Sequence, residues 1–238
     1  MKITSVNGSP KGRNSNTHKM MKEIIKGVEA QGAEVESIFL SEVKVKHCLG
    51  CLACWLDKNK ECVIKDDMAM LIDKWTQSDI VICGTPIHSD NVSSILKTFI
   101  DRCIPIVSPF MDKDEHGEYK HKENDRHIPK CVIVSNGAYP EQSQFQVISH
   151  FFKRLARNSN MEIIAEIYRG QGSWLTLPEF SPNRVYVDAY FELLNRVGEE
   201  IVISGTLSDE TQSKLAEPLG SFDEYMSNLE SYWLKSIK

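Results

Sequence analysis

The chain has 238 residues, of which 41% are hydrophobic and 26% charged, and its formal net charge is −5. This composition is typical of a globular protein with one α/β domain and a sizeable core. The acidic balance argues against a nucleic-acid surface, and no apolar run approaches the roughly 20 residues needed to span a membrane. Residues 2–6 indicate a strand and no signal peptide, and the seven cysteines are an odd number. We therefore expect reduced thiols in the cytoplasm.

The first predicted turn, residues 7–17, joins a strand over residues 2–6 to a helix over residues 16–31 and is rich in Gly, Ser, Asn and Thr. Such a turn suits a phosphate, because glycines allow sharp bends and the free N–H groups of a helix's first turn attract anions. It has neither the Walker spacing nor the dinucleotide fingerprint Gly-x-Gly-x-x-Gly. The alternative is a turn that only caps the helix, with Asn14 or Ser15 as the N-cap.

A second strand is predicted over residues 34–40, and the loop after it carries four cysteines, Cys48, Cys51, Cys54 and Cys62. The spacing Cys-x2-Cys-x2-Cys-x7-Cys lets three thiolates wrap one [4Fe–4S] cubane while the fourth closes it. Zinc is a second interpretation, although zinc sites more often use two separated Cys-x-x-Cys pairs. A third is a reduced cysteine loop that holds no metal.

The rest of the chain alternates between helical and strand patterns. Strands are predicted over residues 79–84, 130–135 and 162–168. Helices are predicted from Asp66 to about Ser78, from the turn after Asn91 to about Cys103, around residues 145–155, and over 183–203 and 221–236. The polar segment 108–129 is expected to be a solvated loop, with a lid or a subunit contact as alternatives.

Five strands that alternate with helices predict one α/β domain built on a doubly wound parallel sheet with helices on both faces. Its core covers about residues 1–170, and helices extend it over about residues 180–238. Ligands of such sheets bind beyond the carboxyl ends of the strands. We expect the turns 7–17, 85–91 and 136–142 to converge there on one crevice.

Several segments, in this order, resemble the NADPH-dependent FMN reductase family. They are Asn7-Gly8-Ser9-Pro10-Lys11 with Ser15-Asn16-Thr17, Cys48-Leu49-Gly50-Cys51-Leu52-Ala53-Cys54-Trp55, Cys62-Val63-Ile64-Lys65-Asp66-Asp67-Met68, and Pro86-Ile87-His88 through Leu96-Lys97-Thr98-Phe99-Ile100-Asp101-Arg102. Within the family the chain is most similar to the iron–sulfur flavoprotein branch. The resemblance covers about residues 1–170 and implies a flavodoxin-like fold, FMN as cofactor, and a homodimer or homotetramer.

Position by position, the resemblance implies three groups of FMN contacts. The phosphate would be bound by Ser9, Lys11, Ser15, Asn16 and Thr17. The isoalloxazine ring would lie along Thr85, Pro86, Ile87, His88, Ser89 and Asn91. The polar edge of the ring would contact Ser135, Asn136 and Gly137. No catalytic residue is expected, because the flavin carries the redox chemistry and water or a backbone N–H can handle the proton.

Two positions depart from the family pattern. Lys11 stands where Arg is common, which keeps the charge and loses the bidentate fork. His88 stands where relatives often have Tyr, so it stacks less well and introduces a pH-sensitive group. The alternative for His88 is a partly exposed loop histidine without a chemical role.

Two functions follow from these patterns. The first is a cytoplasmic FMN-dependent NAD(P)H oxidoreductase that reduces a quinone, a free flavin or another small acceptor. The alternative is an electron carrier in which FMN and a [4Fe–4S] cluster at Cys48, Cys51, Cys54 and Cys62 relay electrons between redox proteins. Neither function involves nucleic acid or a membrane.

Overall fold

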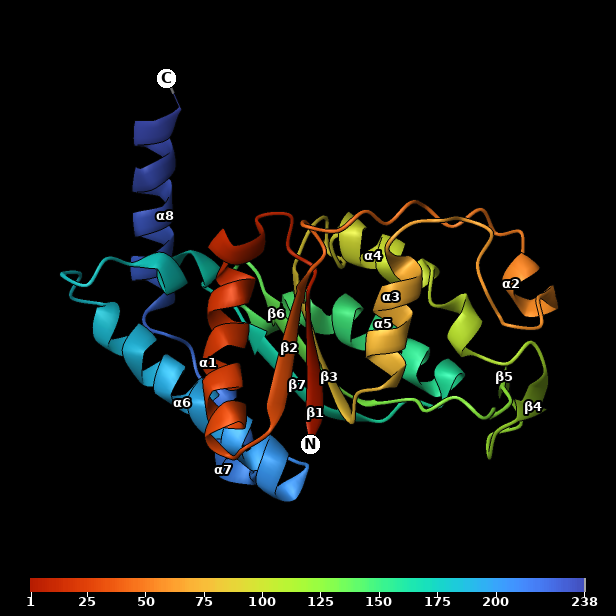
Figure 1. The fold of residues 1–238 in the computed structure, drawn as a ribbon. Helices are drawn as coiled ribbons and strands as arrows, with labels where there is room; N and C mark the ends of the chain where they lie inside the picture. The colour runs from red at the N-terminus through yellow and green to blue at the C-terminus, as the bar shows by residue number, and fades with distance from the viewer. Residues whose placement is uncertain (238) are drawn as a thin grey trace.

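Five parallel strands form the central sheet of the computed structural model, which describes residues 1–237 (Figure 1). The strands are β1 (Lys2–Asn7), β2 (Glu34–Phe39), β3 (Ile80–Pro86), β6 (Lys130–Asn136) and β7 (Ile163–Arg169). They lie in the order β2-β1-β3-β6-β7, so the predicted doubly wound, flavodoxin-like sheet is confirmed. Asn7 is level with Gly84, and Pro86 is level with Asn136. The turns after β1, β3 and β6 therefore leave the sheet at the same edge.

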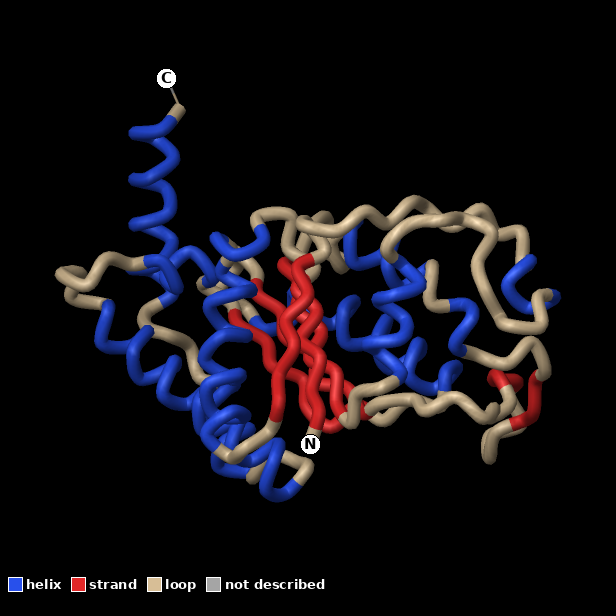
Figure 2. Tube along the Cα trace, viewed as in Figure 1, coloured by secondary structure: helices blue, strands red, loops and turns tan. Residues whose placement is uncertain are grey.

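Helices cover both faces of this sheet, as Figure 2 shows. They are α1 (Asn16–Ala30), α2 (Ala53–Leu56), α3 (Met68–Thr76), α4 (Ser94–Asp101), α5 (Gln146–Ser159), α6 (Arg184–Ser204), α7 (Asp209–Ala216) and α8 (Phe222–Ser236). Short 3₁₀ helices span Gly12–Asn14, Ile104–Ile106, Gln142–Phe145 and Gly172–Thr176. Apolar residues of α1 and α6 form the core on one face, while α3, α4 and α5 form it on the other. Within residues 1–237, no helix combines the length and apolarity needed to cross a membrane.

The helices α1 and α6 touch at two glycines. A Cβ on Gly27 would lie 1.9 Å from the carbonyl oxygen of Asn195, and one on Gly198 would lie 2.1 Å from that of Ile24. Only a hydrogen atom fits at either position, so the two backbones can approach closely. This contact fixes α6, from the C-terminal third of the chain, against the first helix of the sheet.

The segment 108–129 is mostly exposed, as expected, but the prediction of a loop is wrong at its centre. There β4 (Met111–Lys113) pairs antiparallel with β5 (Tyr119–His121). Arg157 on α5 donates two hydrogen bonds, of 2.6 and 2.9 Å, to Asp114 in the hairpin turn. The two side chains are only 21% and 12% exposed. This ion pair fixes the position of the hairpin, which its polar sequence does not reveal.

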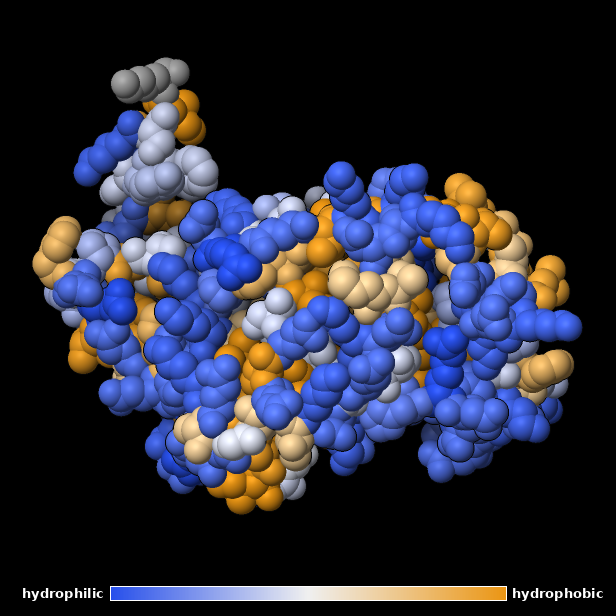
Figure 3. All heavy atoms as spheres, viewed as in Figure 1, coloured by the Kyte–Doolittle hydropathy of each residue, from blue (hydrophilic) through white to orange (hydrophobic). Residues whose placement is uncertain are grey.

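The two ends of the molecule carry exposed apolar side chains. Figure 1 shows α8 projecting from the body, with Tyr225 buried at its base and Tyr232 and Trp233 exposed further along. In Figure 3 an apolar surface lies at the opposite end, where Figure 1 places α2, and Leu49 and Leu56 of the cysteine loop are exposed. The last residue of the predicted C-terminal extension, Lys238, lies outside the described residues.

Candidate functional site

Hydrogen bonds join the three predicted turns to one another. The N–H of Gly8 donates to the carbonyl of Gly84 at 2.7 Å, which links the first turn to β3. The amide of Asn136 donates to the hydroxyl of Thr17 at 2.8 Å, and the N–H of Ile87 donates to the carbonyl of Asn136 at 2.9 Å. The structure thus brings together residues from all three turns at the carboxyl edge of the sheet.

Hydrogen bonds within the first turn hold its shape: the N–H of Ser9 donates to Asn7 Oδ1 at 2.8 Å, and the N–H of Gly12 donates to the Ser9 carbonyl at 2.9 Å. Gly12 has φ +49°, and a Cβ there would lie 2.6 Å from the hydroxyl of Ser41, so the bend requires glycine. The Ser9 hydroxyl accepts the N–H of Lys11 at 3.3 Å. Ser15 is the N-cap of α1: its hydroxyl accepts the N–H of His18 at 3.0 Å. The helix-capping interpretation is therefore correct for Ser15. The N–H groups of Asn16 and Thr17, which follow the cap, have no acceptor within the helix and are the ones suited to an anion.

The basic side chains at this turn differ in whether their charge is available to a ligand. Arg13 is held by Glu42, at 2.8 and 3.0 Å, and its guanidinium lies 4.1 Å from the ring centroid of Phe39. Burial lowers the pKa of His18, and the charges of Lys22 and Arg13 lower it further. Lys11 is exposed and forms no salt bridge in the part of the chain that the structure describes. The turn combines a cation, free N–H groups and the positive end of a helix dipole, which is the chemistry that a phosphate requires.

Two buried polar atoms at this edge have no hydrogen-bond partner among residues 1–237. They are the amide nitrogen of Asn7 and the hydroxyl of Ser135. An unpaired buried polar atom costs about 1–3 kcal/mol. A polar group of a ligand at the ends of β1 and β6 would remove that cost. Asn7 was missed by the sequence analysis, and the signal for it is an amide side chain on the last residue of a buried strand.

The second turn stands on a small hydroxyl network. The Thr85 hydroxyl donates to the carbonyl of Pro86 at 2.9 Å and accepts the N–H of Ser93 at 3.0 Å. Beyond it, His88, Ser89 and Asn91 are exposed. Ser89 has φ +47°, in the left-handed region where side chains are strained. The turn therefore presents its tip to solvent on a rigid base.

The third turn is held by the C-terminal third of the chain. The Tyr225 hydroxyl on α8 donates to the carbonyl of Ala138 at 2.5 Å. The N–H groups of Gln171 and Gly172 donate to the carbonyls of Tyr139 and Gly137 at 3.0 and 2.9 Å. Gln171 and Gly172 are held in turn by Leu219 and Asn16, at 2.8 and 2.7 Å. No local sequence pattern predicts these contacts, because their partners lie far apart in the chain.

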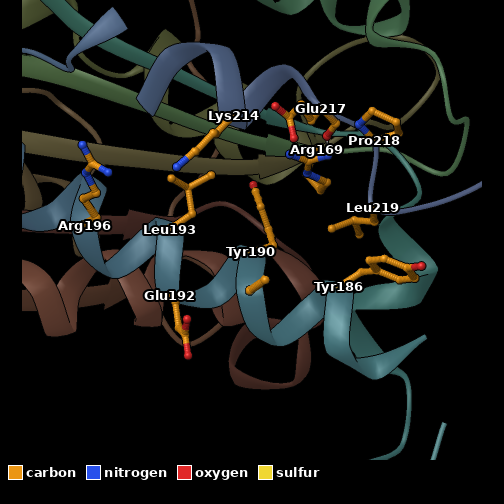
Figure 4. A pocket seen from close by; sticks show the side chains of 11 residues that line it. Arg169, Tyr186, Tyr190, Glu192, Leu193, Arg196, Lys214, Glu217, Pro218 and Leu219 are labelled. Carbon is orange, nitrogen blue, oxygen red and sulfur yellow. Dashed lines mark hydrogen bonds between the residues drawn. The ribbon is translucent and has the colours of Figure 1, made fainter. Parts of the chain in front are cut away.

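A cavity of about 480 Å³ lies elsewhere, between α6 and residues 214–219 (Figure 4). Arg169 is almost completely buried beside it and donates to the carbonyls of Leu215 and Glu217, both at 2.6 Å. Its guanidinium lies 4.1 Å from the ring centroid of Tyr190. None of the predicted site residues lines this cavity. The buried arginine anchors the C-terminal segment to the end of β7.

The four predicted cysteines line one depression, together with Ile64, Arg102 and Ile104. Burial raises the pKa of the Cys54 thiol, and the neighbouring sulfur of Cys62 raises it further. In residues 1–237 no group of three or more Cys, His, Asp or Glu side chains is arranged so that it could hold a metal ion. The structure gathers the thiols without placing them in a coordination geometry.

Two hydrogen-bond donors point at these sulfurs. The N–H of Gly50 donates to Cys48 Sγ at 3.4 Å, and the Arg102 guanidinium donates to Cys62 Sγ at 3.5 Å. Donors to sulfur stabilise thiolates and iron–sulfur clusters. Four thiols with N–H donors therefore suit an iron–sulfur cluster by their chemistry, and binding one would require the sulfurs to move into coordination geometry.

Arg102, which lines the depression, forms a buried ion pair with Asp66. Arg102 Nη1 and Nη2 donate to the two carboxylate oxygens of Asp66 at 2.7 and 3.1 Å, and the side chains are 1% and 3% exposed. Burial opposes ionisation of Asp66, but hydrogen bonds from Arg102 and from the N–H groups of Lys46 and Met68 lower the pKa of the carboxyl. The helix predicted from Asp66 begins two residues later, at Met68, with Asp67 as its N-cap. The Asp66 carboxylate accepts the N–H of Met68 at 3.1 Å and also binds Arg102.

Trp55 anchors the opposite side of the same loop. Its indole N–H lies 3.1 Å from the carbonyls of both Ile104 and Val107, and its ring stands edge-on to His121 of β5 at 5.8 Å. The cysteine loop is thus fixed to the segment that follows α4 and to the hairpin.

The fold and these turns define a flavodoxin-like α/β protein with a phosphate-type turn at the switch point of its sheet. The sequence profile of the NADPH-dependent FMN reductase family matches residues 1–122, just over half of the chain. The chain belongs to this family.

Curated relatives match the same part of the chain. An iron–sulfur flavoprotein of Archaeoglobus fulgidus is 41% identical over 105 residues, which are 44% of this chain and 46% of that protein. An iron–sulfur flavoprotein of Clostridioides difficile is 37% identical over 147 residues, 58% of this chain and 64% of that protein. The chain therefore spans about half to two thirds of the length of these relatives.

Solved structures with low sequence identity share the fold. An FMN-dependent NADH-azoreductase of Bacillus anthracis in complex with FMN has a TM-score of 0.61 at 14% identity, over 84% of this chain and 98% of that one. An NAD(P)H:quinone oxidoreductase of Methanothermobacter marburgensis has a TM-score of 0.59 at 12% identity, with the same coverage of each chain. At these identities the likeness establishes the fold.

The substitution Asp66→Asn is expected to lower the free energy of unfolding at pH 7 by about 3–5 kcal/mol, because it leaves the Arg102 charge buried without its partner. Folding lowers the pKa of Asp66. The stabilisation by this carboxylate is therefore complete above its unfolded pKa of roughly 3.9, and it is lost as the pH falls through the lower pKa of the folded protein. Urea unfolding should therefore separate wild type and variant at pH 7, and the gap should narrow below about pH 4.

The matched control is Asp101→Asn, which removes an exposed ion pair with Lys97 on the adjoining helix. Exposed pairs contribute about 0–1 kcal/mol. Equal urea midpoints for the two variants at pH 7 would show that the buried pair does not stabilise the fold.

Proposed function

We propose that the protein is an FMN-dependent NAD(P)H oxidoreductase that reduces a quinone, a flavin or another small acceptor. The observation that carries this proposal is the hydrogen-bonded union of three turns at the carboxyl edge of the sheet. Membership of the NADPH-dependent FMN reductase family supports it, as do the reductase activities named for the two structural neighbours. The flavin would supply the redox chemistry by accepting hydride and passing electrons on.

The chain's own residues would bind and orient the cofactor. The cation of Lys11 and the free amides of the first turn suit the phosphate. Ser9, Asn16 and Thr17 line the same turn, and Ser15 fixes its junction with α1. In the second and third turns, the N–H groups of Ile87, His88, Asn91 and Gly137 are used in hydrogen bonds of the fold. Those of Ser89, Asp90 and Ala138 would face the ring and stabilise negative charge on it. We assign no side chain to proton transfer.

The test is reduction of the bound flavin. Protein reconstituted with FMN and mixed with NADH or NADPH without oxygen should lose its yellow colour. A chain that takes up no FMN would overturn the proposal, and so would a bound flavin that stays oxidised with both nucleotides.

A second measurement addresses the phosphate contact. Lys11→Ala should weaken FMN binding by about 10-fold to 100-fold, since a charge-assisted hydrogen bond contributes roughly 1.5–3 kcal/mol. The control is Lys58→Ala, an exposed lysine of the cysteine loop. A fluorescence titration of FMN that gives equal dissociation constants for both variants would remove Lys11 from the site.

The four cysteines favour a second candidate function, an iron–sulfur flavoprotein that carries electrons between redox proteins. It is supported by the gathering of Cys48, Cys51, Cys54 and Cys62 around one depression with N–H donors. The names of the curated relatives agree with it. These four thiolates would hold a [4Fe–4S] cluster, which would pass single electrons. Zinc and empty thiols are the competing states of the same loop.

Iron and acid-labile sulfide should decide among these states. Protein purified without oxygen is expected to hold about four irons per chain, and Cys51→Ala should lose them. Cys131→Ala, which removes a buried thiol of β6 outside the loop, is the control and should retain them. Zinc in place of iron, or no metal at all, would reject the electron carrier and leave the oxidoreductase.

We further propose that the chain assembles as a homodimer or homotetramer in the cytoplasm. The uncovered apolar side chains of α8, Tyr232 and Trp233, support an assembly that buries them. Sedimentation equilibrium should give a multiple of the 27.1 kDa chain mass. A single species at the chain mass would reject the assembly.

A further inference from the structure

Arg102 joins the two ends of the cysteine loop. Besides binding Asp66, its Nη1 donates to the carbonyl of Lys46 at 2.8 Å and its Nη2 donates to Cys62 Sγ at 3.5 Å. Lys46 precedes Cys48 by two residues, and Asp66 follows Cys62 by four. One guanidinium therefore fixes the start of the loop, its end and one sulfur.

The same side chain sets the charge of the depression. Arg102 is the only cationic side chain among the described residues that line it; Asp101 is the acidic one. The guanidinium is 1% exposed, so salt and water screen it little. Asp66 neutralises much of its charge, but the N–H that points to Cys62 remains a directed donor.

We propose that Arg102 is a positioning residue for the cysteine site: it holds Cys62 in place for an iron–sulfur cluster and raises the reduction potential of that cluster. The inference rests on the second candidate function above. An added electron increases the negative charge on the cluster's sulfurs, and an N–H donor to a ligand sulfur stabilises that charge. Removing the donor therefore favours the oxidised state.

Arginine suits this role because its planar fork binds several acceptors at fixed angles. A lysine at this position carries the same charge but has a single nitrogen. It can neutralise Asp66 and lacks the geometry to reach Lys46, Asp66 and Cys62 together. Arg102→Lys thus removes the directed hydrogen bond to sulfur and keeps the positive charge that balances the buried carboxylate.

The experiment is a redox titration of the cluster in full-length protein, followed by visible and electron paramagnetic resonance spectra. Arg102→Lys is expected to move the midpoint potential to a more negative value and to release iron faster to a chelator. The control, Arg184→Lys, alters an arginine of α6 that also binds an aspartate, Asp188, and a backbone carbonyl, that of Leu177. It lies on the other face of the sheet from the cysteine loop and should match wild type.

A second variant guards against misfolding. The pair Asp66→Asn with Arg102→Gln leaves no unpaired buried charge, and it should show the same negative shift. If the wild type binds iron but all variants have its midpoint potential and its rate of iron release, the inference about Arg102 is overturned and the proposed electron carrier still stands. Wild type without iron–sulfur signals would overturn both, so the two failures are distinguishable.

Discussion

The cysteine loop depends on one constraint, the buried ion pair of Arg102 and Asp66. Two charges taken out of water cost several kcal/mol each, and only good geometry with further hydrogen bonds offsets that cost. Here both oxygens of the carboxylate are used, and the guanidinium also reaches Lys46 and Cys62. A loop of irregular backbone with four thiols gains a fixed base in this way. Without the pair, its position would rest on single hydrogen bonds near its ends, such as that between His47 and Thr98 of α4, and on Trp55.

The fold was predictable because its signals are local. The almost wholly apolar strands β3 and β6 indicated a buried parallel sheet, and the turns after them followed from the sheet's direction. Ser15 was predictable as a cap for the same reason. The short helix α7 was missed because its sequence, with Leu215 as its one large apolar residue, has no clear amphipathic period. The hairpin of β4 and β5 was missed because a mostly exposed, polar strand lacks the alternation of apolar and polar residues that distinguishes a strand from a loop.

The supports of the candidate site could not be predicted, because they join residues far apart in the chain. Tyr225 and Ala138 are separated by 87 residues, and Arg102 and Asp66 by 36. Sequence alone placed Asp66 at the start of a helix, one residue before the actual cap, and left Arg102 inside a family motif without a physical role. Long-range pairs become visible only when the topology places α4 beside the cysteine loop and α8 beside the third turn.

The helix α4 connects the first turn with the cysteine loop. At its N-terminal end, Ser93 caps the helix and its hydroxyl donates to the carbonyl of Gly8 in the first turn. At its C-terminal end, Arg102 follows the last helical residue and reaches the cysteine loop. The eight residues between span about 12 Å. Because α4 is a rigid element with buried polar contacts at both ends, the geometry of the first turn and that of the cysteine loop are set together.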